Sequence, residues 1–203
     1  MTETHNAPTY NIVKVPDAVL KETAHEVGDI NDDIQIQTAR MIATMYEGAG
    51  IGLAANQVGL LNRIFVMDLP EGSWQHGPEV NGVLTIDAGY RSGEAEQDVP
   101  KNPRAFINPK VTWESEIKSV YDEGCLSIPG QYAQIVRPAQ VRVKFWDETG
   151  AEHEEEFDGL DSHCVQHEID HLNGVLFIDY LSSLKRNMIL RKMKKFNKDA
   201  GAL

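Results

Sequence analysis

The residues best suited to chemistry form a short run, His167-Glu168-Ile169-Asp170-His171. Two histidines four positions apart project from the same face of a helix, so both imidazoles can bind one metal ion. Glu168 lies beside them and can reach a water molecule on that metal. The spacing therefore predicts a hydrolytic metal site. The alternative is a pair of helix histidines that are hydrogen-bonded within a core.

A third metal ligand must come from elsewhere, because a catalytic metal normally takes three protein ligands and leaves one position open for water. Downstream, Phe177 occupies the position of the third histidine of metzincin peptidases, and no glutamate follows Glu168. Upstream, Glu123-Gly124-Cys125-Leu126-Ser127 offers a thiol. A thiolate with two imidazoles suits zinc or ferrous iron, although Cys125 taken alone is more often a buried apolar residue.

A third segment, Gly50-Ile51-Gly52-Leu53-Ala54-Ala55-Asn56-Gln57, combines small residues with a neutral amide. Glycine and alanine let the backbone approach another backbone or a ligand closely, and Gln57 can donate hydrogen bonds. The segment lacks the Lys-Ser/Thr pair of a phosphate-binding P-loop and the glycine spacing of a dinucleotide site. Taken alone, it indicates only a turn.

Together the three segments closely resemble the motifs of the peptide deformylase family. The family motifs GxGLAAxQ, EGCLS and QHExDHL correspond here to residues 50–57, 123–127 and 166–172, in the same order. The similarity covers most of residues 11–198, including Pro16-Asp17, and fails over residues 70–104. Three linked motifs are far more specific than any one of them.

The resemblance implies a metal-dependent hydrolase that removes the N-formyl group from the N-terminal methionine of newly synthesised polypeptides and releases formate. It implies that Cys125, His167 and His171 bind one metal ion, with Fe²⁺ expected natively and Zn²⁺ or Ni²⁺ as alternatives. Metal-activated water would attack the formyl carbon, with Glu168 as general base and then acid. The metal, the Gln57 amide and the Leu126 backbone N–H would stabilise the oxyanion.

The resemblance also implies a set of substrate-binding residues. Gly52 would offer its backbone to the substrate as an added strand. The methionine side chain would be surrounded by Ile51, Tyr121, Glu123, Leu160, His163 and Cys164. Helical spacing supports part of this set, because Leu160, Cys164, His167 and His171 share one face.

Two positions in this set carry alternatives. Glu123 could orient Gln57 or a metal ligand by a hydrogen bond, without itself binding the metal. His163 departs from the family, which usually has a small or apolar residue there. We expect His163 to point to solvent; the alternative is that it alters the pocket.

The elements that must position these residues are those of an α+β fold. Asn31 can cap a helix over residues 31–48, and residues 63–69 have the apolar run of a buried strand. Short strands are expected near 105–112, 117–121, 131–136, 141–147 and 151–157. Helices are expected over 159–172 and 180–198. The expected arrangement is therefore antiparallel strands around a central helix that carries the histidine pair, with an N-terminal and a C-terminal helix.

The domain organisation is predicted to be simple. The chain has 203 residues, an ordinary length for one domain and short for two, so residues 1–203 are expected to form a single catalytic domain. Residues 1–10 are interpreted as a flexible leader. Residues 70–104, with many prolines and glycines, are interpreted as an inserted surface loop that contains one strand near 82–86.

Charge and composition limit the partners. The net charge of −12 argues against a DNA-binding surface, yet residues 185–203 carry a local +6. In the family a basic C-terminal helix is implicated in docking at the ribosomal exit tunnel, and we expect the same of this helix. The alternative is that the apolar stripe of the helix packs onto the domain. This stripe consists of Leu181, Leu184, Met188, Ile189, Met193 and Phe196. Two cysteines and no signal or membrane-spanning segment favour a cytoplasmic protein without a membrane partner.

Two other classes of function remain open from the sequence. A zinc endopeptidase would cut internal peptide bonds, but its third ligand is missing downstream. A non-catalytic, metal-stabilised module bound to ribosomes would explain the basic helix without needing Glu168. The open position expected with three ligands favours catalysis over a structural metal.

Overall fold

A computed structural model describes residues 8–70, 72–88 and 101–200. It contains three α-helices, which are α1 (Asp32–Glu47), α2 (Gly159–Leu172) and α3 (Ser183–Ala200). Three short 3₁₀ helices accompany them, η2 (Ala18–Lys21), η3 (Ala55–Val58) and η4 (Phe177–Tyr180). The strands are β1 (Gly52–Ala54), β2 (Ile64–Met67), β3 (Trp74–Val80), β4 (Val83–Ala88), β5 (Arg104–Glu114), β6 (Lys118–Gly124), β7 (Tyr132–Pro138), β8 (Gln140–Trp146) and β9 (Glu152–Asp158).

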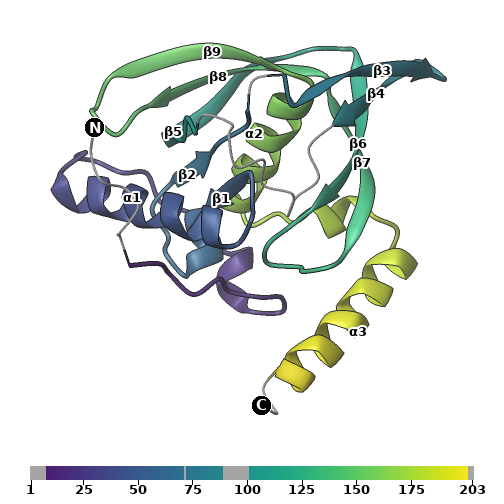
Figure 1. Ribbon diagram of the computed structural model, residues 1–203, viewed down its shortest axis with the longest axis horizontal. Coiled ribbons are helices and arrows are strands. Elements are labelled where there is room, and N and C mark those ends of the chain that lie inside the picture. Colours follow the sequence, from purple (N-terminus) through teal and green to yellow (C-terminus); the bar gives the residue numbers. More distant parts are fainter. Residues whose placement is uncertain (1–7, 71, 89–100, 201–203) are drawn as a thin grey trace.

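The strands form two sheets on either side of α2 (Figure 1). One sheet has the order β1-β2-β5-β8-β9 and the other β3-β4-β6-β7. All neighbouring strands are antiparallel except β4 and β6, which run parallel. The predicted α+β class with a central histidine-bearing helix is confirmed, and among the described strands the pair β4–β6 departs from the predicted antiparallel order.

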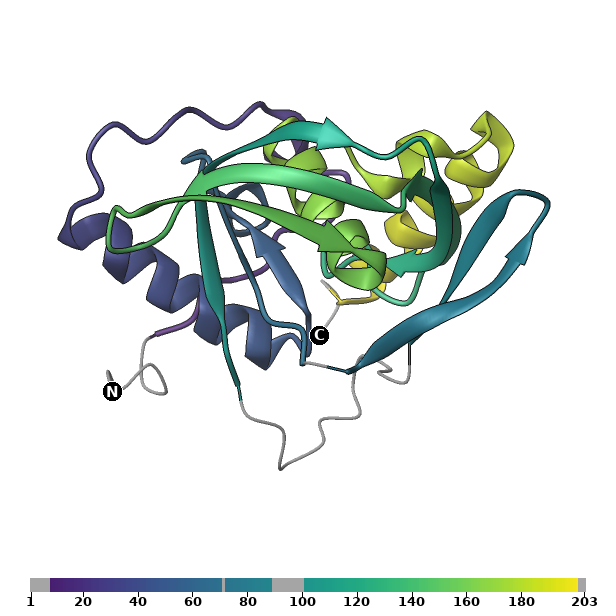
Figure 2. The ribbon, with the colours of Figure 1, turned by 90° about the horizontal axis from the view of Figure 1, so that it is seen from above.

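The five-stranded sheet is covered by helices on both faces of its β1–β2 end. The four residues of β2 are all buried, because α1 lies against one face and α2 against the other (Figure 2). Farther along the sheet β8 alternates, with Val141, Val143 and Phe145 buried between exposed or half-buried neighbours, so the described residues cover mainly one face there. This is the alternation expected of a strand in a sheet with one solvent-exposed face. The core beneath α2 therefore continues across the whole sheet.

Local signals set the start of both long helices. The side chain of Asn31 accepts a hydrogen bond from the Ile34 N–H, as expected of a helix N-cap. Asp158 accepts one from the Gly159 N–H at the start of α2. Gly159 has a φ of +51°, and a Cβ there would overlap the Trp74 ring. Strand β3 thus packs directly against the N-terminal turn of α2.

The segment 70–104 contains more regular structure than predicted. The strand expected at 82–86 corresponds to β4, and β3 joins it to form a hairpin. Because β4 also pairs with β6, the hairpin extends the second sheet. Residues 1–7 of the predicted leader, and residues 71 and 89–100 of the predicted insertion, lie outside the described residues.

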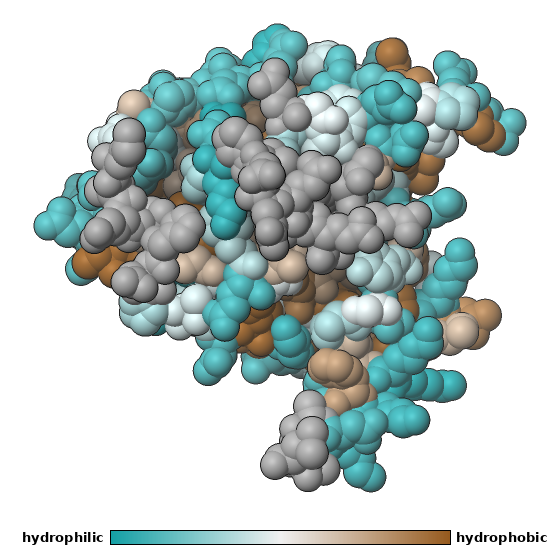
Figure 3. All heavy atoms as spheres, viewed as in Figure 1, coloured by the Kyte–Doolittle hydropathy of each residue, from teal (hydrophilic) through white to brown (hydrophobic). Residues whose placement is uncertain are grey.

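Helix α3 packs on the domain along only part of its predicted apolar stripe. Ile189 and Met193 are buried, and the Asn197 amide donates to the Val15 carbonyl oxygen at 2.8 Å. Leu184 and Met188, in contrast, are 73% and 53% exposed. Figures 1 and 3 show α3 projecting from the body of the protein with teal, hydrophilic side chains along it. In the described part of the chain, no helix combines the length and apolar composition needed to cross a membrane.

Candidate metal centre and active site

The three predicted ligands converge from two elements. Strand β6 ends at Gly124, where a Cβ would lie 2.5 Å from the Tyr132 ring, and Cys125 follows immediately. His167 and His171 project from α2 toward it. The Cys125 Sγ lies 3.2 Å from Nε2 of His171, and one ligand atom from each of the three residues lies within 4.8 Å of the others.

This cluster has the chemistry of a divalent metal site. One thiolate and two imidazole nitrogens are the donors that zinc and ferrous iron accept. Four buried side-chain oxygen or nitrogen atoms of the described residues lack a hydrogen-bond partner, and two of them, Oε2 of Glu168 and Nδ1 of His171, belong to this region. Buried polar atoms are normally paired, so an unpartnered carboxylate oxygen of a residue that lines the same cavity as Cys125 and His167 fits a site that takes a metal ion and a water molecule.

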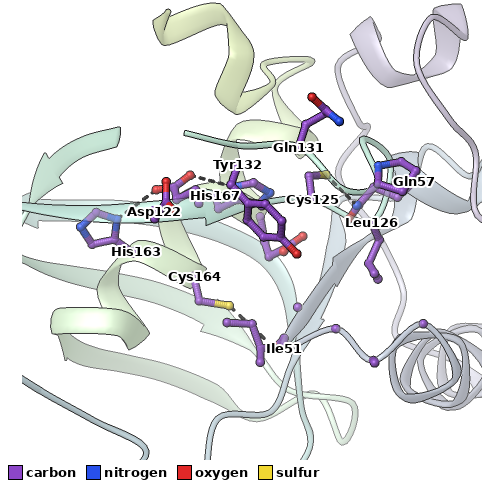
Figure 4. Close-up of a pocket in the computed structure, with 18 of the residues that line it drawn as sticks. Ile51, Gln57, Asp122, Cys125, Leu126, Gln131, Tyr132, His163, Cys164 and His167 are labelled. Carbon is purple, nitrogen blue, oxygen red and sulfur yellow. Dashed lines mark hydrogen bonds and ion pairs between the residues drawn. The ribbon is translucent and has the colours of Figure 1, made fainter. Parts of the chain in front are cut away.

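Glu123 lies behind this cluster and is shared by three cationic or hydrogen-donating side chains (Figure 4 shows the surrounding pocket). Its Oε2 lies 2.9 Å from Nδ1 of His167, and its Oε1 lies 2.9 Å from Nδ1 of His163. Arg137 donates to both oxygens, at 2.6 and 3.0 Å. Burial alone would raise the pKa of Glu123, but these hydrogen bonds hold it well below its usual value. Glu123 is therefore a carboxylate.

Arg137 belongs to the site and is not among the residues predicted from the sequence. It is 3% exposed and also donates from Nη1 to Asp170 at 2.8 Å. Asp170 accepts a further hydrogen bond from the Tyr180 hydroxyl at 2.8 Å. One signal was present in the sequence: Arg137 shares the inward parity of the buried Ile135 on β7. A buried arginine needs acidic partners, and Glu123 and Asp170 provide them.

Glu168 faces the edge of the first sheet. An added Cβ at Gly52 would lie 2.5 Å from its Oε1, so only glycine lets β1 approach this closely. The residue is 4% exposed, and burial raises the pKa of Glu168 to about 7. Gly50 is constrained similarly, since a Cβ there would lie 2.7 Å from the Leu126 side chain.

Gln57 is oriented by the backbone of its own segment. Its Oε1 accepts a hydrogen bond from the Ala54 N–H at 2.8 Å, which turns its Nε2 toward Cys125 Sγ and Ser127 Oγ, each at 3.4 Å. The Lys14 ammonium donates to the Leu126 carbonyl oxygen at 2.9 Å. The amide of Gln57 and the backbone around Leu126 are therefore both held beside the cluster.

A cavity of about 430 Å³ opens beside the cluster (Figure 4). Every residue predicted to bind substrate lines this cavity: Ile51, Gly52, Tyr121, Glu123, Leu160, His163 and Cys164. Gln57, Leu126, Cys125, His167 and Glu168 line it as well. Strand β1 is an edge strand of its sheet, and an extended ligand could be added along the edge that no other described strand pairs with.

The expectation that His163 points to solvent is wrong. The residue is 1% exposed, and both ring nitrogens have hydrogen-bond partners, Glu123 at Nδ1 and Ser119 at Nε2. Both partners lie on β6, which packs over this part of α2. The packing of β6 on α2 is a contact between distant parts of the chain, and helical periodicity around His163 does not encode it.

Known proteins establish the family. The chain matches the family model described as polypeptide deformylase over residues 9–187. A protein of Novosphingobium aromaticivorans named peptide deformylase is 45% identical over 189 residues, which are 93% of this chain and 97% of that protein. The chain belongs to the peptide deformylase family. The predicted resemblance and the predicted enzyme class are thereby confirmed.

Solved structures of peptide deformylases share the fold over almost the whole chain. The enzyme of Ehrlichia chaffeensis is 36% identical with a TM-score of 0.79, covering 95% of this chain and 98% of that one. A structure of the Ehrlichia chaffeensis enzyme in complex with actinonin is 37% identical with a TM-score of 0.77, covering 93% and 97%. The two sheets and the central helix are thus those of a peptide deformylase.

Proposed function

We propose that this chain removes the formyl group from the N-terminal methionine of newly synthesised polypeptides and releases formate. The observation that carries the proposal is the convergence of Cys125, His167 and His171 beside the buried Glu168, at the wall of a cavity. Membership of the peptide deformylase family supports the class of reaction.

In this proposal Cys125, His167 and His171 hold one divalent metal ion per chain, Fe²⁺ natively, with Zn²⁺ or Ni²⁺ as alternatives. Such an ion, when bound, would supply Lewis acidity to the attacking water and to the formyl oxygen. The hydrogen bond from His167 Nδ1 to Glu123 leaves its Nε2 available as a ligand. The thiol of Cys125 gives up its proton on binding, as thiol ligands do.

Glu168 acts as general base and then as general acid. It takes a proton from the water that attacks the formyl carbon and returns a proton to the nitrogen of the departing peptide, so the amide C–N bond breaks and formate is released. Its position against the backbone of Gly52 supports this role, because the substrate backbone would lie along the same strand edge. Nε2 of Gln57 and the N–H of Leu126 donate to the oxyanion.

The substrate peptide adds to the free edge of β1 and pairs with the backbone at Gly52. Its methionine side chain enters the cavity, which is lined by Ile51, Tyr121, Glu123, Leu160, His163 and Cys164. The complex of the Ehrlichia chaffeensis relative with actinonin supports a ligand site in this fold. Apolar side chains in the lining suit a thioether.

The remaining assignments concern the whole chain. We take residues 1–203 as one catalytic domain, with residues 1–10 as a leader and residues 70–104 as an insertion. The basic helix predicted at 180–198, observed as α3, docks near the ribosomal exit tunnel. The protein acts in the cytoplasm on formylmethionyl peptides and has neither DNA nor membrane as a partner.

Formate release tests the proposal. Protein purified without oxygen is incubated with formyl-Met-Ala-Ser, and formate and the new amine are measured together. We expect equal amounts of both, with no formate from the unformylated peptide and no cleavage of internal peptide bonds. Internal cleavage would favour an endopeptidase, and protein that contains one metal ion per chain yet releases no formate would contradict the proposal.

A further inference from the structure

His163 connects the wall of the cavity to the metal cluster. It lies on α2, one helical turn before His167, and its ring is almost wholly buried. Its Nδ1 lies 2.9 Å from Oε1 of Glu123, and its Nε2 lies 3.0 Å from Oγ of Ser119. Two residues of β6 therefore hold both nitrogens of a ring that α2 supplies.

The chemistry of Glu123 sets the direction of each hydrogen bond. An ionised carboxylate only accepts hydrogen bonds, so His163 and His167 each donate to it from Nδ1. In a neutral imidazole the other nitrogen is then an acceptor. Nε2 of His163 accepts the hydroxyl proton of Ser119, and Nε2 of His167 carries the free lone pair that a metal ion needs.

We infer that His163 is a positioning residue of the metal site: together with Ser119 it holds the Glu123 carboxylate, and through that carboxylate it orients His167. The inference rests on the proposed metal-dependent function. Arg137 restrains Glu123 from β7, whereas His163 restrains it from α2, the helix that also carries His167. Both imidazoles, one helical turn apart, thus donate to the same carboxylate, which fixes the orientation of each ring.

The same arrangement explains how a histidine can line an apolar cavity. With both nitrogens occupied, the ring offers its carbon atoms to a ligand. The ring also lies edge-on to Tyr121, with centroids 6.0 Å apart. His163 therefore contributes to metal binding without making the pocket polar, and its removal changes metal affinity more than it changes the preference for the first side chain.

A pair of variants of nearly equal size tests the inference. His163→Leu removes the donor to Glu123, and His163→Asn retains an N–H donor close to the position of Nδ1. We expect His163→Leu to weaken Zn²⁺ binding about tenfold in competition with a chromophoric chelator and to alter the visible absorption bands of the Co²⁺-substituted protein. His163→Asn recovers most of the affinity and the wild-type band shape. A role confined to packing would instead favour His163→Leu, because burying an amide costs more than burying an apolar side chain.

Two further measurements define the outcome. In both His163 variants, the ratio of kcat/KM for formyl-Met and formyl-norleucine peptides stays within about twofold of the wild-type ratio. The control variant is His153→Leu, which lies on β9 outside the cavity and leaves Zn²⁺ affinity unchanged. Equal Zn²⁺ affinities for His163→Leu and His163→Asn would overturn the inference. If neither His163 variant folds, Ser119→Ala tests the inference instead. We expect Ser119→Ala to bind Zn²⁺ more weakly than wild type, and unchanged Zn²⁺ affinity would contradict the inference. Metal binding is measured without turnover, so failure of the inference is distinct from failure of wild-type protein to release formate.

Discussion

At the residue scale, the candidate metal ligands are held by buried side chains that come from β6 and β7. The spacing of His167 and His171 on one helix predicts a metal-binding pair, whereas Cys125 joins them only through the family resemblance. The side chains behind the ligands carry no comparable signal of their partners. Arg137 reaches Glu123 only because β6 and β7 pair, and His163 is buried only because β6 covers α2. Such contacts depend on tertiary packing, which no local pattern encodes.

Gly52→Ala tests the close approach of β1 to Glu168. The new Cβ would lie 2.5 Å from Glu168 Oε1 and 3.0 Å from Cys164 Sγ, so the carboxylate must move. Because a displacement of about 1 Å can cost about 100-fold in rate, we expect kcat for formate release to fall by about that factor while bound metal is retained. Gly28→Ala, where a Cβ meets nothing within 4 Å, is the control. A wild-type kcat in Gly52→Ala would show that this contact does not position Glu168.

At the scale of elements, periodicity predicted α1, α2 and most strands close to their observed bounds. Strand β3 was not predicted, because Gly77 and Pro78 lie inside it and both residues disfavour strands. The hairpin accommodates them with a register shift between His76 and Glu79. The apolar stripe of α3 predicted more packing than occurs, since Leu184 and Met188 stay exposed.

Charge reversal on α3 tests ribosome docking. The helix has an exposed basic face, and contacts between such a face and RNA phosphates depend strongly on salt. We expect reversal to Glu of all four lysines in the last part of α3 to reduce co-sedimentation with ribosomes severalfold at low salt, while deformylation of a short peptide continues at the wild-type rate. These lysines are Lys192, Lys194, Lys195 and Lys198.

The control for this experiment changes charge elsewhere. Lys101→Glu and Lys110→Glu, which lie outside α3 and outside the cavity lining, together should leave co-sedimentation unchanged. Ribosome binding that survives the reversal on α3, or that does not respond to salt, would contradict docking and leave α3 as a helix that covers part of the core.

At the scale of the whole molecule, the site lies where two sheets and one helix meet. Cys125 comes from the end of the four-stranded sheet, the histidines come from α2, and Gly52 comes from the edge of the five-stranded sheet. The fold class was predictable from the order of elements. The division into two sheets was not, because the parallel pairing of β4 with β6 is a long-range contact.

Metal removal should therefore lower the stability of the whole folded protein. A ligand present at 100 times its Kd stabilises the folded state by about 2.7 kcal/mol, and one kcal/mol corresponds to about 2–4 °C in Tm for a chain of this size. We expect chelation to lower the Tm by about 5–10 °C and Zn²⁺ to restore it, as measured by calorimetry. The Cys125→Ala variant should show little response to either treatment. An unchanged Tm in wild-type protein whose metal loss has been verified would contradict a metal that bridges these elements.

The most direct test of the account separates the base from the ligands. Formate release from formyl-Met-Ala-Ser is measured for wild type and Glu168→Gln, with bound metal quantified in the same samples. Since Glu168 is proposed to move protons and not to bind metal, Glu168→Gln should retain one metal ion per chain and lose about 10³-fold in kcat. Wild-type turnover by metal-loaded Glu168→Gln, or a loss of rate that follows a loss of metal, would contradict the central claim.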